Sequence, residues 1–313
     1  SKGAAAGRGD VFYRIYDVYL YFLYVQKTLK GCNILGEYWK ESSRIHVRLE
    51  RNAKEMSEML EVKNLTVRFG QMTIVNEISF SVFPGEWLMI IGPNGAGKST
   101  INNAISRAVP YTGTVLFEGK DIRRSKSREM AQNIGVLSQN HYVGYGFTVE
   151  EVIRLGRYAH APGLLSGGKD EGEEKVREAI QKTGMEPYLN QSVLTLSGGE
   201  LQRTFLAQLF AQDPRLLILD EPTNHLDLIY QKQVFALVGE WLKKSGRAVI
   251  SVVHDLSLAR AYGTHALLMK KGRIVSIGSV EQVMTPENLN QVYDMDVYDS
   301  MRQMYGQGGG GMQ

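Results

Sequence analysis

The clearest pattern of apolar and polar positions begins at residue 59. The two types alternate along 59–69 and again along 78–83, which is typical of strands with one buried face, and Pro84-Gly85 predicts a turn after the second run. The next segment, WLMIIG at 87–92, is apolar without interruption. Such a run is expected of a strand that is buried on both faces. The pattern therefore predicts an antiparallel pair followed by a buried strand.

The rest of this region mixes helical and strand patterns. Helical periodicity dominates from about residue 148 to 212, and the Gly-rich stretch 163–174 predicts a surface loop inside it. The apolar runs at 215–222 (RLLILDEP) and 247–255 (RAVISVVHD) are expected to be buried parallel strands that end in acidic or imidazole side chains. Strands alternating with helices predict an α/β fold with a parallel core sheet.

The first 58 residues differ in composition from the rest of the chain. Residues 11–25 are crowded with aromatic side chains, and 41–58 are rich in charge and expected to be helical. Three interpretations stay open: translated upstream sequence or an artificial addition, a helix at a membrane surface, or another interaction element. We therefore expect an extension (1–58), one domain (59–300) with a helical subdomain at about 145–212, and a disordered tail (301–313).

Charge and cysteine content narrow the possible functions. Residues 1–58 hold ten Lys/Arg against seven Asp/Glu, which accounts for the whole net charge of +3. The balanced remainder argues against a nucleic-acid-binding core. No apolar stretch approaches the length needed to cross a bilayer, and no secretory signal is evident. Cys32 is the single cysteine, so no intrachain disulfide can form, and a reducing compartment fits.

The most specific motif comes directly after the strand predicted at 87–92. The pattern GxxxxGKS occupies the junction between that strand and a predicted helix, which is the context of a phosphate-binding loop. Its glycines let backbone N–H groups close around phosphate oxygens, Lys98 is expected to reach the β- and γ-phosphates, and Ser99 to ligate Mg²⁺. The alternative is a Gly-rich turn that matches by chance. The expected ATP-binding residues here are Gly92, Pro93, Asn94, Gly95, Ala96, Gly97, Lys98, Ser99 and Thr100.

Two of the predicted strands end in residues that suit ATP hydrolysis. Asp220 is expected to hold Mg²⁺, and Glu221 to act as general base toward the attacking water. His254 could hydrogen-bond a γ-phosphate, which makes it a candidate catalytic residue. The alternatives are a solvated turn for the acidic pair and a structural role for the histidine.

A second glycine-rich stretch, LSGGELQ at 196–202, precedes an apolar helical pattern. Ser197, Gly198 and Gly199 are therefore expected at a helix N-terminus, where free N–H groups and the helix dipole favour an anion. The simpler alternative is an ordinary serine N-cap.

With these motifs in this order, residues 59–300 resemble an ATP-binding cassette (ABC) ATPase. The resemblance implies that Ser197, Gly198 and Gly199 contact the γ-phosphate bound by a second copy, so that two chains enclose two ATP molecules head to tail. It also implies that Gln139 touches Mg²⁺ and senses a membrane partner, with a part in catalysis. By the same resemblance, Asp227 links the two sites of the dimer and Phe69 stacks on adenine.

Two positions depart from the commonest family pattern. Glu200 stands where many members have Gln, and Phe69 where Tyr is commonest; neither change removes a catalytic group. The Glu variant, together with 147–160, 220–228 and 268–297, resembles the ATPases of iron–siderophore, haem and cobalamin importers.

The resemblance implies ATP and Mg²⁺ as cofactors and two transmembrane permease subunits as partners. It also implies an indirect link to a substrate-binding protein and a cytoplasmic position on the inner face of the membrane. The sequence does not identify the transported substrate. Alternatives are the ATPase of a zinc or manganese importer or of an exporter, a soluble ABC protein acting on nucleic acid or ribosomes, and a non-hydrolysing assembly module.

Overall fold

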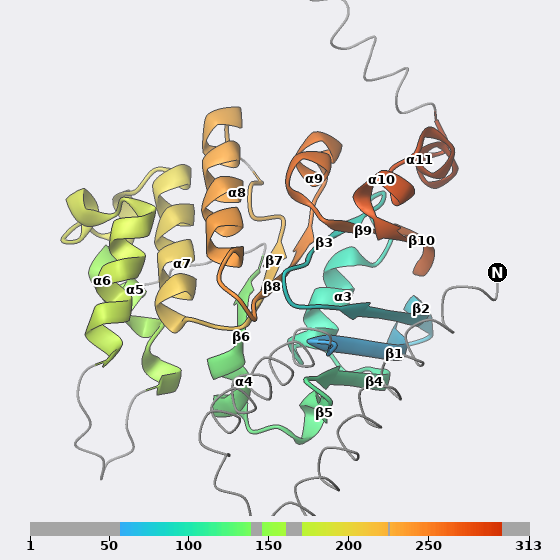
Figure 1. Cartoon of the computed structure of the whole chain (residues 1–313), viewed down its shortest axis with the longest axis horizontal. Coiled ribbons are helices and arrows are strands. Elements are labelled where there is room, and N and C mark those ends of the chain that lie inside the picture. Colours follow the sequence, from blue (N-terminus) through green and yellow to red (C-terminus); the bar gives the residue numbers. More distant parts are fainter. Residues whose placement is uncertain (1–56, 139–145, 161–170, 225, 296–313) are drawn as a thin grey trace, which may run out of the picture. The chain divides into compact units, whose positions relative to one another are not determined.

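The computed structural model describes residues 57–138, 146–160, 171–224 and 226–295, all within the unit Glu55–Gln313. The expectations for residues 1–56 and 301–313 lie outside the described residues. In the described part, the longer strands form two sheets (Figure 1). One is antiparallel, with strand order β2-β1-β4-β5, and its strands are β1 (Leu60–Phe69), β2 (Met72–Val82), β4 (Thr112–Phe117) and β5 (Lys120–Asp121). The predicted antiparallel pair is thus confirmed.

The other sheet has the order β10-β9-β3-β8-β7-β6, and β10 alone runs antiparallel to its neighbour. Its strands are β3 (Trp87–Ile91), β6 (Ile134–Leu137), β7 (Leu216–Asp220), β8 (Ala248–Val252), β9 (His265–Lys270) and β10 (Arg273–Ser279). The three apolar runs predicted as buried strands are β3, β7 and β8. Because β8 lies between β3 and β7, the carboxyl ends of these strands meet at one edge of the sheet.

Alternate residues of β3 and β7 enter two different hydrophobic clusters. In β3, Met89 and Ile91 belong to the cluster that contains residues of the helices between 149 and 293, while Leu88 and Ile90 belong to the cluster that contains residues of α3 (Lys98–Ile105) and the antiparallel sheet. All five residues of β3 are buried. Burial on both faces explains why the sequence of such a strand is continuously apolar rather than alternating.

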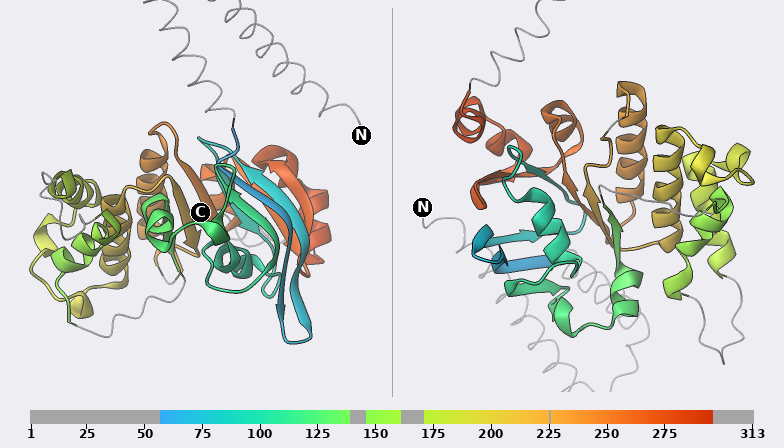
Figure 2. Two further views of the ribbon diagram at one scale, coloured as in Figure 1. Left: turned by 90° about the horizontal axis from the view of Figure 1, so that it is seen from below. Right: turned by 180° about the vertical axis from the view of Figure 1, so that it is seen from behind.

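The α-helices of the described part are α3 (Lys98–Ile105), α4 (Ser127–Asn133), α5 (Val149–Leu155), α6 (Glu171–Thr183), α7 (Gly198–Gln212), α8 (Leu228–Leu242), α9 (Leu256–Tyr262), α10 (Val280–Val283) and α11 (Pro286–Tyr293). Short 3₁₀ turns occur at 122–124, 158–160, 186–188 and 193–195. Both α5 and α6 pack against α7, and the two views of Figure 2 show these three helices together, away from the antiparallel sheet. This is the helical insertion expected from the sequence.

One boundary differs from expectation. The loop predicted at 163–174 ends earlier, because α6 already begins at Glu171. Glu173 forms an ion pair with Arg154 of α5, and acidic residues in a first helical turn interact favourably with the helix dipole. Its glycine and acidic residues predicted a loop, whereas its last residues, from Glu171, are helical.

Candidate active site

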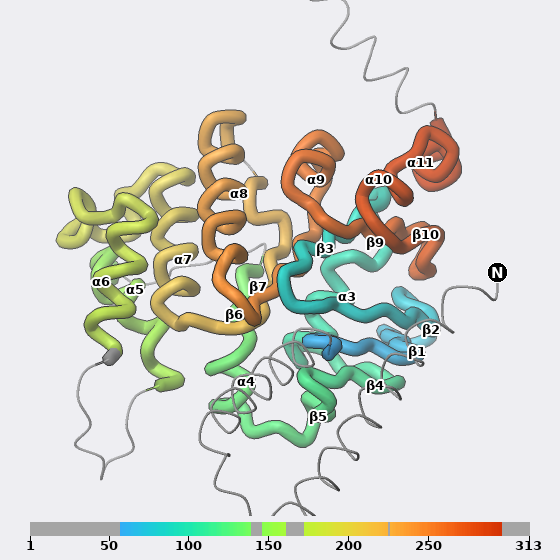
Figure 3. The backbone as a smooth tube through the Cα atoms, in the orientation of Figure 1, coloured from blue at the N-terminus to red at the C-terminus, as the bar shows by residue number. Residues whose placement is uncertain are grey.

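The phosphate-binding loop lies between β3 and α3, as its motif predicts (Figure 3). Gly95 and Gly97 adopt φ values of +76° and +96°, which side chains with a Cβ rarely adopt. A Cβ on Gly97 would also lie only 2.9 Å from the carbonyl oxygen of Ile74 on β2. The loop therefore requires glycine where it turns and where it approaches β2.

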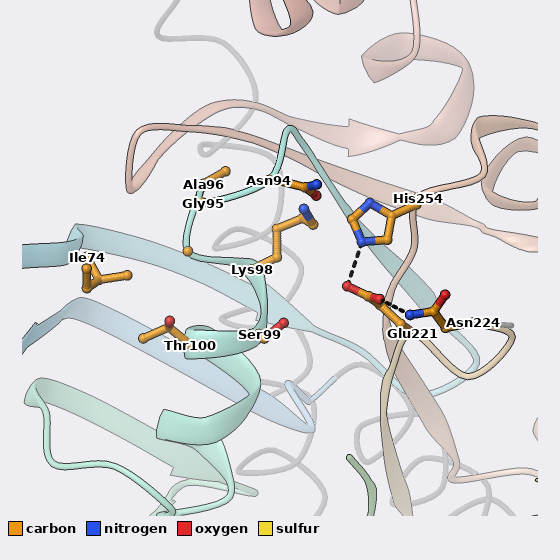
Figure 4. Close-up of a pocket in the computed structure, with 11 residues that line it drawn as sticks. Ile74, Asn94, Gly95, Ala96, Lys98, Ser99, Thr100, Glu221, Asn224 and His254 are labelled. Carbon is orange, nitrogen blue, oxygen red and sulfur yellow. Dashed lines mark hydrogen bonds and ion pairs between the residues drawn. The ribbon is translucent and has the colours of Figure 1, made fainter. Parts of the chain in front are cut away.

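Residues of this loop line a cavity of about 700 Å³ (Figure 4). The lining residues are Ile74, Asn94, Gly95, Ala96, Gly97, Lys98, Ser99, Thr100, Glu221, Asn224 and His254. The structure thus brings most of the predicted loop together with Glu221 and His254, which lie more than 120 residues further along the chain. Gly92 and Pro93, the first two residues of the loop, do not line the cavity, but their carbonyl oxygens accept hydrogen bonds from Lys98 Nζ.

Lys98 occupies the first position of α3, and its ammonium group is held by the loop itself. Nζ donates to the carbonyl oxygens of Gly92 at 2.8 Å and Pro93 at 3.0 Å. Burial lowers the pKa of Lys98, and the nearby carboxylates of Glu221 and Asp220 partly offset that effect. Figure 4 shows the side chain directed toward the space beside His254 and Glu221. The ammonium group of Lys98 is therefore already placed at the cavity, where it could bind an anionic ligand.

Ser99 and Asp220 meet across the site. The Ser99 hydroxyl donates to Oδ1 of Asp220 at 2.9 Å, although the two residues are 121 positions apart. Asp220 is the last residue of β7 and is buried. Burial raises the pKa of Asp220, and the hydrogen bond from Ser99 counteracts only part of that shift. A buried carboxylate beside a hydroxyl offers the hard oxygen ligands that Mg²⁺ prefers.

Glu221 is held by hydrogen bonds at both carboxylate oxygens. His254 Nε2 lies 2.5 Å from Oε1, and Asn224 Nδ2 donates to Oε2 at 3.0 Å (Figure 4). The backbone of Glu221 has φ +51°, an uncommon conformation for a residue other than glycine. His254 comes shortly after β8, so the neighbouring strands β7 and β8 bring the two side chains together.

Ser197 caps the N-terminus of α7 in a reciprocal arrangement with Glu200. The Ser197 hydroxyl accepts from the Glu200 N–H at 3.4 Å, while Oε2 of Glu200 accepts from both the N–H and the hydroxyl of Ser197 at 2.8 Å. These hydrogen bonds lower the pKa of Glu200. Ser197, Gly198 and Gly199 are not among the lining residues of the cavity. This second glycine-rich segment is therefore not part of the cavity formed by the phosphate-binding loop.

The remaining predicted residues have different surroundings. Phe69 ends β1 with 51% of its surface exposed and does not line the cavity, whereas Ile74 of β2 does. Asp227 caps α8, since its Oδ1 accepts from the N–H of Tyr230 at 3.0 Å. Gln139 lies outside the described residues.

Two cavity residues were not predicted from the sequence. Asn224 holds the carboxylate of Glu221 from a turn three residues later, and its amide in DEPTN is the signal that could have suggested it. Ile74 gives no such signal, because it is one apolar residue among many on β2. Its part in the cavity depends on how β2 packs against the loop.

Comparison with known proteins decides the family. The ABC transporter family matches residues 75–224. The ferric enterobactin transport ATP-binding protein FepC of Escherichia coli is 36% identical over 75% of this chain and 87% of FepC. The iron(3+)-hydroxamate import ATP-binding protein FhuC of Bacillus subtilis is 35% identical over 76% of this chain and 88% of FhuC. This chain is a member of the ABC transporter ATP-binding proteins.

Membership confirms the expected family and supports ATP hydrolysis coupled to transport. The ABC transporter ATP-binding protein YvrA of Bacillus subtilis is also similar, with 39% identity over 76% of this chain. The chain spans about half the length of YvrA, 54%.

Solved structures of the same family share the fold. A chain of a metal-chelate type ABC transporter superposes with a TM-score of 0.66 at 22% identity, covering 76% of this chain and 90% of that one. CbiO1 of Clostridium perfringens gives a TM-score of 0.65 at 25% identity, covering 80% and 99%. The expected α/β core with an antiparallel sheet and a helical insertion is thus confirmed.

Membrane-spanning helices and metal-binding clusters are both missing from the described residues. None of the helices in this part of the chain is both long and apolar enough to span a bilayer. Nor do the described ranges contain three or more His, Cys, Asp or Glu side chains grouped to hold a metal ion.

Proposed function

We propose that this chain is the ATP-hydrolysing subunit of an importer for a metal-chelate substrate. The observation that carries the proposal is the cavity in which Lys98, Ser99 and Glu221 converge. The relatives support the substrate class through their names, which describe transport of ferric enterobactin, import of iron(3+)-hydroxamate and, for HmuV of Methylobacillus flagellatus, import of hemin.

ATP is the proposed nucleotide, and its phosphates fit the loop. Residues Gly92 to Thr100 would surround the phosphate chain with backbone N–H groups, and Lys98 would exchange the carbonyls of Gly92 and Pro93 for phosphate oxygens. A charge-assisted contact to phosphate is stronger than one to a neutral carbonyl, so the exchange favours the bound state.

Mg²⁺ is the proposed metal, with Ser99 and Asp220 as its protein ligands. The hydroxyl and the carboxylate are already 2.9 Å apart, and the buried Asp220 would gain a compensating charge. Gln139 is proposed as a third contact. When bound, Mg²⁺ supplies neutralisation of charge on the phosphate oxygens.

In the proposed reaction, Glu221 orients the attacking water and accepts its proton. His254 and Asn224 hold the two oxygens of this carboxylate, so they position it before any nucleotide arrives. His254 would also contact the γ-phosphate when ATP is present. Phosphoryl transfer depends mainly on positioning and charge, which is what these side chains provide.

The second anion site belongs, in this proposal, to a neighbouring copy of the chain. Ser197, Gly198 and Gly199 would contact the γ-phosphate of the partner's ATP, Asp227 would link the two sites, and Phe69 would stack on adenine. This is consistent with the absence of the first three from the lining of the cavity. Two permease subunits and, through them, a substrate-binding protein complete the assembly, with this chain on the cytoplasmic face of the membrane.

The experiment measures phosphate release and oligomeric state on the same preparation. With ATP and Mg²⁺ we expect hydrolysis, and with ATP plus the Glu221→Gln variant we expect a stable dimer that ADP does not support. Co-expression with a candidate permease pair should recover this chain in the membrane fraction. A chain that binds ATP yet stays monomeric, both alone and beside its permease, would contradict the head-to-tail arrangement.

A further inference from the structure

Backbone hydrogen bonds hold the turn that carries Glu221. The N–H of Glu221 donates to the carbonyl oxygen of Val252 at 3.1 Å, which fixes the start of the turn to β8. The N–H of Asn224 donates to the carbonyl oxygen of Glu221 at 3.1 Å and closes the turn. Pro222 lies between them, is buried and has no N–H to donate. Its carbonyl oxygen is therefore the one backbone group through which Pro222 can be held by a hydrogen bond.

Gln202 of α7 makes that hydrogen bond. Its Nε2 donates to the carbonyl oxygen of Pro222 at 2.7 Å, although the two residues are 20 positions apart in the chain. The bond is partly buried, so it is electrostatically stronger than the same bond in water. Because Glu221 directly precedes Pro222, the contact fixes the backbone one residue away from the carboxylate that is proposed as general base.

The first turn of α7 also packs against the segment that follows Pro222. A Cβ on Gly199 would lie 2.9 Å from the ring of Tyr230, and a Cβ on Gly198 would lie 3.8 Å from Cδ2 of Leu226. The close approach of the Tyr230 ring is possible because residue 199 has no side chain. Pro222, Leu226 and Tyr230 therefore all lie beside the N-terminal part of α7.

The helix α7 thus connects two parts of the proposed reaction. Its N-terminus, at residues 197–199, is the proposed contact for the ATP of a partner chain, and Gln202 lies about one turn further along. Rigid elements and the hydrogen bonds between them are the routes by which one site affects another. A displacement of α7 against the partner's phosphate would therefore reach Pro222 and the turn of Glu221.

We propose that Gln202 is a positioning residue for Glu221, which makes hydrolysis in each chain depend on the placement of its own α7. The proposal rests on the proposed function, because it assumes that Glu221 is the general base and that residues 197–199 meet a second ATP. Gln202 does not line the cavity of the phosphate-binding loop. Its loss should therefore lower kcat without weakening ATP binding.

The test is the Gln202→Met variant, which keeps the length of the side chain and removes its hydrogen-bond donor. We expect kcat to fall about 3- to 10-fold, the change that corresponds to the loss of one hydrogen bond. KM for ATP, and the dissociation constant of a fluorescent ATP analogue, should stay within about twofold of the parental values. A parental kcat, or a loss that lies entirely in KM, would overturn the proposal.

Gln212→Met is the matched control, because Gln212 is the last residue of the same helix. Its Nε2 donates to the carbonyl oxygens of Ala131 at 2.6 Å and Ile134 at 3.0 Å, and neither acceptor lies in the turn after β7. Thermal unfolding should show a loss of stability in both variants, whereas kcat should fall in Gln202→Met alone. An equal fall of kcat in both variants would mean that α7 acts through stability only, which would also overturn the proposal.

Mixed dimers separate an effect on Glu221 from an effect on the partner's ATP. One chain keeps Glu221 and the other carries Glu221→Gln, so that a single site hydrolyses ATP. Gln202→Met in the chain that keeps Glu221 should slow single-turnover phosphate release about 3- to 10-fold, as in the dimer of two Gln202→Met chains. The same substitution in the other chain should leave the rate unchanged. A loss that is equal or larger in the second arrangement would contradict the link to Glu221.

Failure of the proposed function would look different from failure of this inference. A parental chain that releases no phosphate, or that forms no dimer with ATP, would contradict the proposed function itself. A parental chain with both activities, beside a Gln202→Met variant whose kcat is unchanged, would contradict only the role of Gln202.

Discussion

The two glycine-rich segments of this chain have similar composition and different surroundings. The loop after β3 lines a cavity with a cation, a hydroxyl and carboxylates from other elements: Lys98, Ser99, Glu221 and the adjacent Asp220. The segment at the start of α7 is capped by its own Glu200 and does not line that cavity. Within the part of the chain that the structure describes, the first segment lines a cavity together with Glu221 and His254, and the second segment does not line it.

A helix N-terminus can therefore act as a catalytic site only when other elements place reactive groups beside it. For the loop after β3, these groups are Glu221, which follows β7, and His254, which follows β8. For α7, we propose that a second chain provides the nucleotide. Substitutions in the two segments should separate their roles, and the largest effect is expected at Glu221.

Glu221→Gln should abolish turnover while leaving the first segment able to bind ATP. Removing a general base typically lowers the rate by about 10²- to 10⁴-fold, and the amide can still fill the space between His254 and Asn224. Single-turnover phosphate release and equilibrium ATP binding are the two measurements. Turnover at the parental rate would remove Glu221 from the reaction.

Lys98→Ala and Ser197→Ala should separate the segments directly. Loss of the Lys98 ammonium is expected to weaken ATP binding by the isolated chain about 10- to 150-fold, because charge-assisted hydrogen bonds are lost. Ser197→Ala should leave that affinity unchanged and reduce ATP-driven dimer formation.

Because Ser197 also caps α7, its removal is expected to cost about 1 kcal/mol of stability. Ser279→Ala is the matched control, since Ser279 and Gln282 form an equivalent capping box at α10. If Ser279→Ala reduced dimer formation as strongly as Ser197→Ala, the effect would come from stability rather than from the proposed phosphate contact.

Glu200→Gln tests whether the negative charge of Glu200 opposes ATP-driven dimerisation, and its expected effect is smaller than those of the substitutions above. Gln retains the capping geometry of position N3 but removes the carboxylate from the place where a partner's phosphate is proposed to bind. We expect ATP-driven dimerisation to strengthen about two- to fivefold at low salt, as a charge of this kind near a helix end is worth about 0.3–1 kcal/mol.

Glu151→Gln makes the same change in the capping box of α5 and should have no such effect on dimerisation. High salt should reduce the gain from Glu200→Gln, because the interaction is electrostatic and exposed. A gain that is equal in both variants, or insensitive to salt, would count against a phosphate near Glu200.

Asp220→Asn should stabilise the nucleotide-free chain slightly while removing its response to Mg²⁺. Burial raises the folded-state pKa of Asp220 above its ordinary 3.8, so the folded protein binds more protons than the unfolded chain between these two values. The free energy of unfolding therefore falls as pH rises through that interval and stays lower above it. The side-chain amide of the Asp220→Asn variant does not ionise, so its free energy of unfolding does not fall in this way.

For the Asp220→Asn chain we expect a higher unfolding temperature than for the parent at pH 7, because the cost of burying the ionised carboxylate is removed. The gain should shrink as pH falls toward the ordinary pKa of aspartate. Thermal unfolding measured between pH 4 and pH 8, with and without Mg²⁺, reports both effects. A variant that is less stable than the parent at pH 7 would show that burial of the charge is not costly here.

Much of the fold and part of the site could be predicted from local sequence patterns. The runs that became β3, β7 and β8 are almost entirely apolar because both faces are buried, with Ser251 in β8 and the terminal Asp220 of β7 as the polar residues. The loop after β3 carries its own glycines and Lys98. The start of α6 at Glu171 was missed, because an acidic Gly-containing stretch is compatible with both a loop and a helix N-terminus.

By itself, the sequence determined the chemical groups, their order along the chain and the family to which they belong. Only the tertiary structure decided that Ser99 meets Asp220 and that Asn224 and His254 hold Glu221. The physical reason is that these contacts depend on strand order and helix packing, which bring together residues far apart in the chain. Local periodicity records which faces of an element are buried, but not which other element covers them.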